Sequence, residues 1–163
     1  MKRTLARAVP FLVALGVVLI AFVAVAPAES VLVVEDTETG EQYITESVEN
    51  GTIVGLRYMH SVEKTPVYDE YRIEGQTLVN TRMEFESYGW GLPARVNVTN
   101  VNGTLVYDPP EPIVELQSLS VSPGRIAGHT LTVGNHSYDL VAATNASGVR
   151  IHIERRSLID LFT

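Results

Sequence analysis

Two side chains in the middle of the chain, His60 and Asp69, are the residues best suited to chemistry. Alternate residues of an extended strand share a face, so His60 falls in a row with Tyr58 and Val62, and Asp69 falls in a row with Tyr71. Each is a polar interruption of an apolar row. An imidazole held against a carboxylate keeps one tautomer or stays protonated, which suits ligand binding or acid–base chemistry.

A single pairing register brings these two residues together. If Val62 opposes Val67 across a four-residue connection, Glu63 to Pro66, antiparallel pairing places His60 opposite Asp69. Two interpretations of such a pair remain open. It can fix the strand register without any chemistry, or it can form part of a ligand-binding or acid–base site.

Two neighbouring features extend the candidate site. Ser61 points to the face opposite His60 and no nucleophile-elbow motif surrounds it, so a hydrolase is the least favoured interpretation. Trp90 is the only tryptophan and stands between two glycines, which allow positive φ or a close backbone approach. Trp90 is therefore either a lid on the core or an aromatic contact for a ligand or partner. The predicted ligand-binding residues are His60, Asp69, Ser61 and Trp90, and the structural residues of the second motif are Gly89, Gly91 and Pro93.

Several functional classes are disfavoured by composition. Cysteine is absent, which excludes disulfides, thiolate metal ligation and a cysteine nucleophile. The four histidines show no paired spacing typical of metal ligands, and no nucleotide-binding fingerprint is present, so we expect no metal and no cofactor. We also expect no enzymatic activity, because no catalytic motif is found. The chain has 19 acidic against 12 basic residues, which argues against nucleic-acid binding.

The elements that must position these residues are predicted to be β-strands. Beyond Ser30, apolar and polar residues alternate and turn signals recur about every ten residues, which predicts an all-β domain: an antiparallel meander, a sandwich or a barrel. The predicted strands are 31–35, 42–48, 52–62, 67–73, 77–85, 95–99, 104–107, 113–116, 130–133, 138–142 and 149–154. One short turn of helix is expected over residues 157–162, with Ser157 as its N-cap.

The first 28 residues are predicted to be a membrane anchor. Residues 8–28 carry no charge, and at about 1.5 Å per residue they span a hydrocarbon core of about 30 Å. Lys2, Arg3 and Arg7 precede this stretch, so the positive-inside rule predicts a single-pass membrane protein with a cytoplasmic N-terminus. The alternative is a cleaved signal peptide. Either way, residues 29–163 are expected to form one extracytoplasmic domain.

The exported domain is rich in Asn-X-Ser/Thr sequons. Two of them coincide with Asn-Gly turns, so turn chemistry and glycosylation are both open explanations. The predicted acceptor residues are Asn50, Asn97, Asn102, Asn135 and Asn145.

Two sequence blocks together resemble a known family. The run His60-Ser61-Val62-Glu63, with Pro66 and the acid at Asp69 after it, is followed by Gly89-Trp90-Gly91-Leu92-Pro93. This order is similar to that of the domain of unknown function 1850, a family of uncharacterised exported prokaryotic proteins associated with TRAP transporters of the TAXI type. The resemblance covers about Val31 to Glu154 and supplies no catalytic residue.

Three functions are therefore expected, in decreasing order. The resemblance and the anchor imply an extracytoplasmic accessory protein whose partners are the bilayer, through residues 8–28, and the subunits of a TAXI-type TRAP transporter for organic solutes. A stand-alone ligand-binding module that uses His60, Asp69 and Trp90 is the first alternative. An envelope hydrolase is the second.

Overall fold

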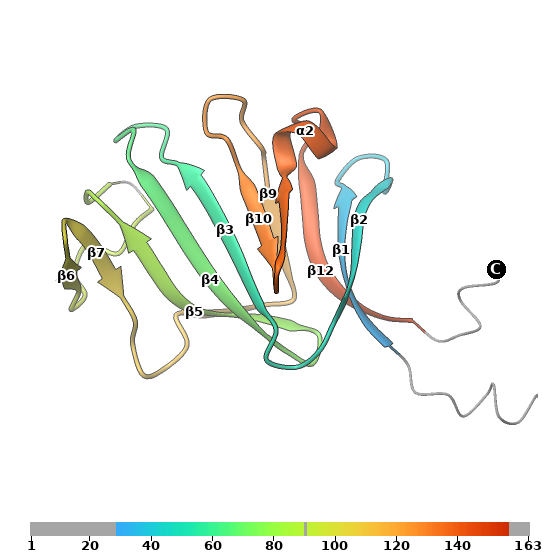
Figure 1. Ribbon diagram of the computed structural model, residues 1–163, viewed down its shortest axis with the longest axis horizontal. Coiled ribbons are helices and arrows are strands. Elements are labelled where there is room, and N and C mark those ends of the chain that lie inside the picture. The colour runs from blue at the N-terminus through green and yellow to red at the C-terminus, as the bar shows by residue number, and fades with distance from the viewer. Residues whose placement is uncertain (1–28, 90, 157–163) are drawn as a thin grey trace, which may run out of the picture. The chain divides into compact units, whose positions relative to one another are not determined.

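The computed structural model of the chain describes residues 29–89 and 91–156 (Figure 1). Two compact units are distinguished, Ser30–Glu154 and a second made of residues 1–29 and 155–163, and the fold is that of the first. Twelve strands and one short helix form within the described residues. They are β1 (Glu29–Asp36), β2 (Gln42–Val48), β3 (Ile53–Met59), β4 (Pro66–Glu74), β5 (Thr77–Phe85), β6 (Thr99–Val101), β7 (Thr104–Tyr107), β8 (Val114–Leu116), β9 (Ser118–Val121), β10 (Thr130–Val133), β11 (His136–Asp139), α2 (Leu140–Thr144) and β12 (Val149–Arg156).

The strands form two sheets, which confirms the prediction of an antiparallel all-β domain. One sheet has the order β2-β1-β12-β9, and the other has the order β11-β10-β3-β4-β5-β7-β6, with β8 also paired to β5. The longest ladders join neighbours in sequence, β3 to β4 and β4 to β5, and both are antiparallel. Both sheets have two ends in their strand order, so neither closes on itself.

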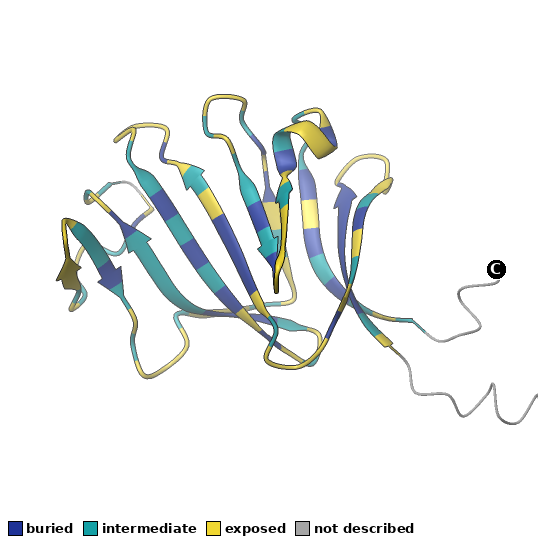
Figure 2. Ribbon diagram, viewed as in Figure 1, coloured by how far each residue is buried: buried dark blue, intermediate teal, exposed yellow. Residues whose placement is uncertain are grey.

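A common hydrophobic core holds the two sheets together. Leu32 and Val34 of β1 and Ile151 of β12 pack in one cluster with Leu56 of β3 and Leu131 of β10. Figure 2 shows buried residues alternating with more accessible ones along β10 and β12, as expected when one face of a strand meets the core, whereas β1 is buried continuously from Val31 to Asp36. A smaller cluster contains Val67 near the start of β4, Phe85 at the end of β5, and Leu92. This second cluster underlies the candidate site.

The region after β10 differs from prediction. The expected strand 138–142 is instead the last part of β11 followed by α2. The Asp139 carboxylate accepts a hydrogen bond from the Ala142 backbone amide at 3.0 Å, which satisfies an amide at the start of the helix. Asn145 ends the helix in the left-handed region with φ of 50°. The capping pair therefore outweighs the alternation of the local sequence.

Two further differences concern short strands. No strand forms over residues 95–98, and β6 begins at Thr99. Val98 nevertheless packs on the smaller core cluster, so the alternation there reflects burial without strand pairing. Conversely, β9 was not predicted. It is only four residues long and pairs with β12, a partner distant in sequence.

Some predicted elements lie outside the described residues. These are the anchor over residues 8–28 and the helical turn over residues 157–162. Within residues 29–89 and 91–156, no helix combines the length and the hydropathy required to cross a bilayer.

Candidate functional site

The turn that joins β3 to β4 is organised by His60. Its backbone amide donates to the Thr65 carbonyl and its carbonyl accepts from the Lys64 amide, both at 2.9 Å. The ring faces inward over the same turn, where Nδ1 accepts from the amides of Val62 at 3.3 Å and Glu63 at 3.2 Å. His60 is buried, so its ring acts as the cap of a turn whose amides would otherwise lack an acceptor.

The predicted pairing of His60 with Asp69 is wrong. In the β3–β4 ladder Met59 opposes Pro66, Tyr58 opposes Val67 and Leu56 opposes Asp69. The connection therefore runs from His60 to Thr65 and has six residues instead of the expected four. His60 closes the turn through its backbone hydrogen bonds to Thr65 and Lys64.

The two sequence blocks that carry the family resemblance meet in space. An ideal Cβ built on Gly89 would lie 2.8 Å from Cγ of Glu63 and 3.2 Å from Cε1 of His60, so a larger residue there would require the Glu63 side chain and the His60 ring to shift. The hydroxyls of Thr65 and Ser87 are 3.0 Å apart and form a hydrogen bond. These contacts hold the start of the β5–β6 connection against the β3–β4 turn.

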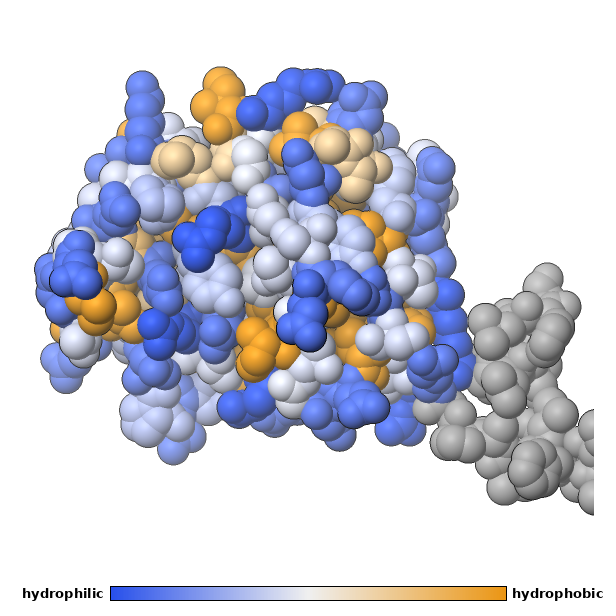
Figure 3. Space-filling view, viewed as in Figure 1, coloured by the Kyte–Doolittle hydropathy of each residue, from blue (hydrophilic) through white to orange (hydrophobic). Residues whose placement is uncertain are grey.

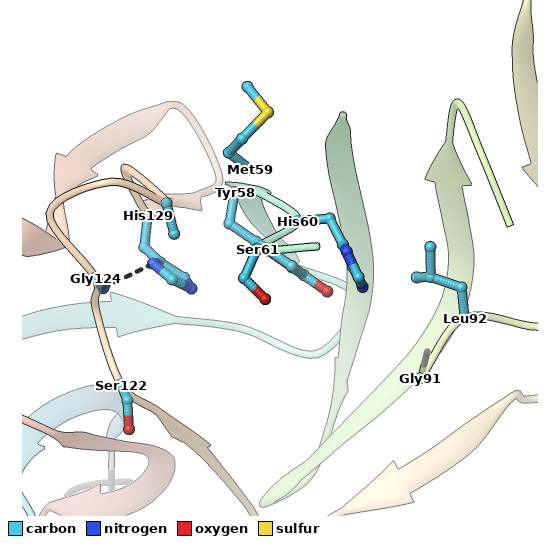
Figure 4. A pocket seen from close by; sticks show the side chains of 10 residues that line it. Tyr58, Met59, His60, Ser61, Gly91, Leu92, Ser122, Gly124 and His129 are labelled. Atoms are coloured by element: carbon cyan, nitrogen blue, oxygen red, sulfur yellow. Dashed lines mark hydrogen bonds between the residues drawn. The ribbon is translucent and has the colours of Figure 1, made fainter. Parts of the chain in front are cut away.

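A cavity of about 410 Å³ lies where this turn meets two other connections (Figure 4). Its volume falls in the usual range of small-molecule sites. The residues around it come from the end of β3, the turn after it, the β5–β6 connection and the β9–β10 connection. They are Tyr58, Met59, His60, Ser61, Gly91, Leu92, Ser122, Gly124, Ala127 and His129.

Among the cavity residues that sequence reasoning did not assign to the site, His129 carries the most chemistry. Its ring stacks on Tyr58 with centroids 5.2 Å apart and an interplanar angle of 11°. Nδ1 accepts from the Gly124 amide at 3.3 Å, so the ring is held from two sides. Burial lowers its pKa, which favours the neutral imidazole. The residue that could have pointed to His129 is Tyr58, which shares a strand face with His60 and whose ring stacks on that of His129.

Asp69 lies beneath Tyr58, outside the residues that line the cavity. Burial raises the pKa of Asp69 to about 6, and a hydrogen bond from the Tyr58 hydroxyl partly opposes this. Its Oδ1 atom is buried without a hydrogen-bond partner in the described part of the chain. Burial, together with the Asp69 charge, raises the pKa of Tyr58, and the same two causes raise that of Tyr71 to about 12. Asp69 therefore acts on the site through Tyr58.

The predicted site residues are thus only partly brought together. His60 and Ser61 line the cavity with Gly91, Gly89 packs on the His60 ring, and Asp69 is one layer deeper. Trp90 lies outside the described residues. Between described residues, no hydrogen bond links Ser61 to either His60 or His129, and no group of three His, Asp or Glu side chains is placed to hold a metal ion.

The surface around the cavity mouth is partly apolar. Ile126, in the β9–β10 connection, is 95% exposed, and Figure 3 shows an apolar protrusion over this loop on a face that is otherwise largely hydrophilic. The loop is tied to β3 by the Met59 amide, which donates to the Ala127 carbonyl at 2.7 Å. The five predicted glycosylation acceptors are all exposed as well.

The family model of a domain of unknown function (DUF1850) matches residues 54–140. The chain belongs to this family. The DUF1850 region runs from β3 to the first residue of α2, so it contains both sequence blocks and His129 and therefore all four segments around the cavity. No curated protein and no solved structure matches the chain.

We predict that His60 stabilises this DUF1850 domain mainly as a turn cap. Replacing His60 with Leu keeps apolar bulk but leaves the amides of Val62 and Glu63 without their acceptor, which costs about 1 to 2 kcal/mol of unfolding free energy. In His60→Asn, the side-chain oxygen occupies a position similar to Nδ1. The Asn variant should therefore be the more stable of the two in urea titrations. Equal stability, or a more stable Leu variant, would show that the ring contributes through packing alone.

We predict that the Asp69 carboxylate makes stability fall as pH rises. The folded protein binds the proton more tightly than the unfolded chain, so stability is lost between pH 3.8 and about 6, by about 3 kcal/mol in all. Urea titrations at pH 4 and pH 8 should show this loss in the wild type but much less of it in Asp69→Asn. Asp108→Asn, which alters an exposed carboxylate, should behave as the wild type. Parallel pH profiles for wild type and Asp69→Asn would contradict the prediction.

Proposed function

We propose that this chain is a binding module for a small organic molecule. The observation that carries the proposal is the cavity of about 410 Å³, which gathers His60 and Ser61 with the stacked pair Tyr58 and His129. A mostly preformed cavity with a few converging polar groups and apolar walls is the usual form of a small-molecule site. Leu92, which is buried, and Met59 supply part of the apolar wall.

Binding should be lost when the cavity is filled. In a thermal-shift screen of small organic molecules against the full chain, we expect hits that stabilise the wild type and lose their effect in Ser61→Trp, because the indole would occupy the cavity. Val62→Trp is the matched control, since Val62 is 64% exposed and lies outside the lining. Hits that survive Ser61→Trp, or no hits at all, would count against the proposal.

The second proposal concerns the partner of this module. The family resemblance supports an accessory role beside a TAXI-type TRAP transporter for organic solutes, with the bound molecule passed to or sensed for the transporter. Ile126, which is almost fully exposed and lies in the β9–β10 connection next to the lining residue Ala127, offers a contact for a partner.

The transporter proposal predicts physical association. The full chain should co-purify with subunits of a TAXI-type transporter, and Ile126→Asp should weaken this association while ligand-induced thermal shifts persist. Substrate uptake should fall in a deletion strain. Normal uptake in that strain, together with no co-purification, would reject the accessory role without affecting the binding module.

A further inference from the structure

The hydrogen-bonding character of the cavity narrows the chemistry of its ligand. His129 provides the clearest hydrogen-bond donor. Because its Nδ1 accepts from the Gly124 amide, a neutral ring carries its proton on Nε2 and presents a donor there. Within the described residues, that Nε2 atom makes no hydrogen bond, and Figure 4 shows the ring directed toward the space occupied by the Ser61 hydroxyl. The stack on Tyr58 keeps the ring in this orientation.

The same tautomer is imposed on the second imidazole. His60 Nδ1 accepts from two backbone amides, so a neutral His60 also carries its proton on Nε2. Ser61 adds a hydroxyl that can donate or accept. The Nδ1 atoms of both rings are thus already engaged by backbone amides, and His129 Nε2 and the Ser61 hydroxyl can donate to a ligand.

The absence of acidic side chains from the described cavity lining also favours a ligand with hydrogen-bond acceptors. The chain has 19 acidic against 12 basic residues, yet no aspartate or glutamate is among the ten residues that line the cavity. The buried carboxylate of Asp69 lies beneath Tyr58 and accepts a hydrogen bond from the hydroxyl of that residue. A ligand with acceptor atoms therefore meets donors at the lining, whereas an ammonium group would find no carboxylate there.

We infer that the cavity binds a small organic carboxylate, with its carboxylate oxygens accepting from His129 Nε2 and the Ser61 hydroxyl and its carbon skeleton against Leu92 and Met59. This inference rests on the proposed binding function. A carboxylate can accept several hydrogen bonds and donates none, and bonds to an ionised acceptor are stronger than neutral ones. A sugar-like ligand fits less well, because its hydroxyl groups require acceptors as well as donors.

Three probes of one shape test the ligand class on the full chain: benzoate, benzyl alcohol and benzylamine. We expect benzoate to bind at least ten-fold more tightly than benzylamine in calorimetric titrations. His129→Phe keeps an aromatic ring for the Tyr58 stack but removes the donor, and should weaken benzoate binding at least ten-fold. The matched control is His136→Phe, because His136 is exposed and outside the cavity lining, and it should leave binding unchanged.

A second variant covers the case in which His129→Phe disturbs the β9–β10 loop. Ser61 is exposed, so Ser61→Ala should fold normally and still weaken benzoate binding several-fold. If benzylamine or benzyl alcohol binds more tightly than benzoate and is displaced by Ser61→Trp, the carboxylate assignment is overturned while the binding module stands. If no probe binds, or benzoate binding is insensitive to Ser61→Trp and to Ser61→Ala, the ligand class is overturned together with this cavity as the binding site.

Discussion

The close approach of Gly89 to the His60 ring is the contact on which the candidate site depends. A side chain at position 89 would require both the ring and the Glu63 side chain to shift, because its first carbon would lie 3.2 Å from the ring and 2.8 Å from Glu63. The hydrogen bond between Thr65 and Ser87 acts in the same place. Together they bring the β5–β6 connection against the β3–β4 turn, which places Gly91 and Leu92 on one wall of the cavity.

Backbone amides organise the polar groups of this site. Both imidazoles use Nδ1 as an acceptor, His60 from two amides of its own turn and His129 from Gly124. A ring held in this way keeps one tautomer without a neighbouring carboxylate. The lining can therefore remain free of acidic residues in an acidic protein, and this is the property from which the ligand class is inferred.

The sheet beneath the cavity contains a buried carboxylate, that of Asp69, whose charged form destabilises the fold. A carboxylate buried among apolar side chains is disfavoured in its charged form, and one of its oxygens has no hydrogen-bond partner in the described part of the chain. The Tyr58 hydroxyl compensates for part of this cost, and Tyr58 also carries the ring on which His129 stacks. Stability and the geometry of the proposed site thus share one residue, so changes at Tyr58 would affect both.

Local patterns determined much of the fold but not the site. Strands such as 42–48 and 77–85 were predicted with their observed ends, because the β-forming residues of each run and the turn residues that bound it are local features of the sequence. The sequence also singled out His60, Ser61 and Gly89. It could not determine the β3–β4 register, since a shift by an even number of residues leaves every side chain on the same face. Only the tertiary structure brought His129 to the cavity, because packing between distant segments leaves no periodic signal in the chain.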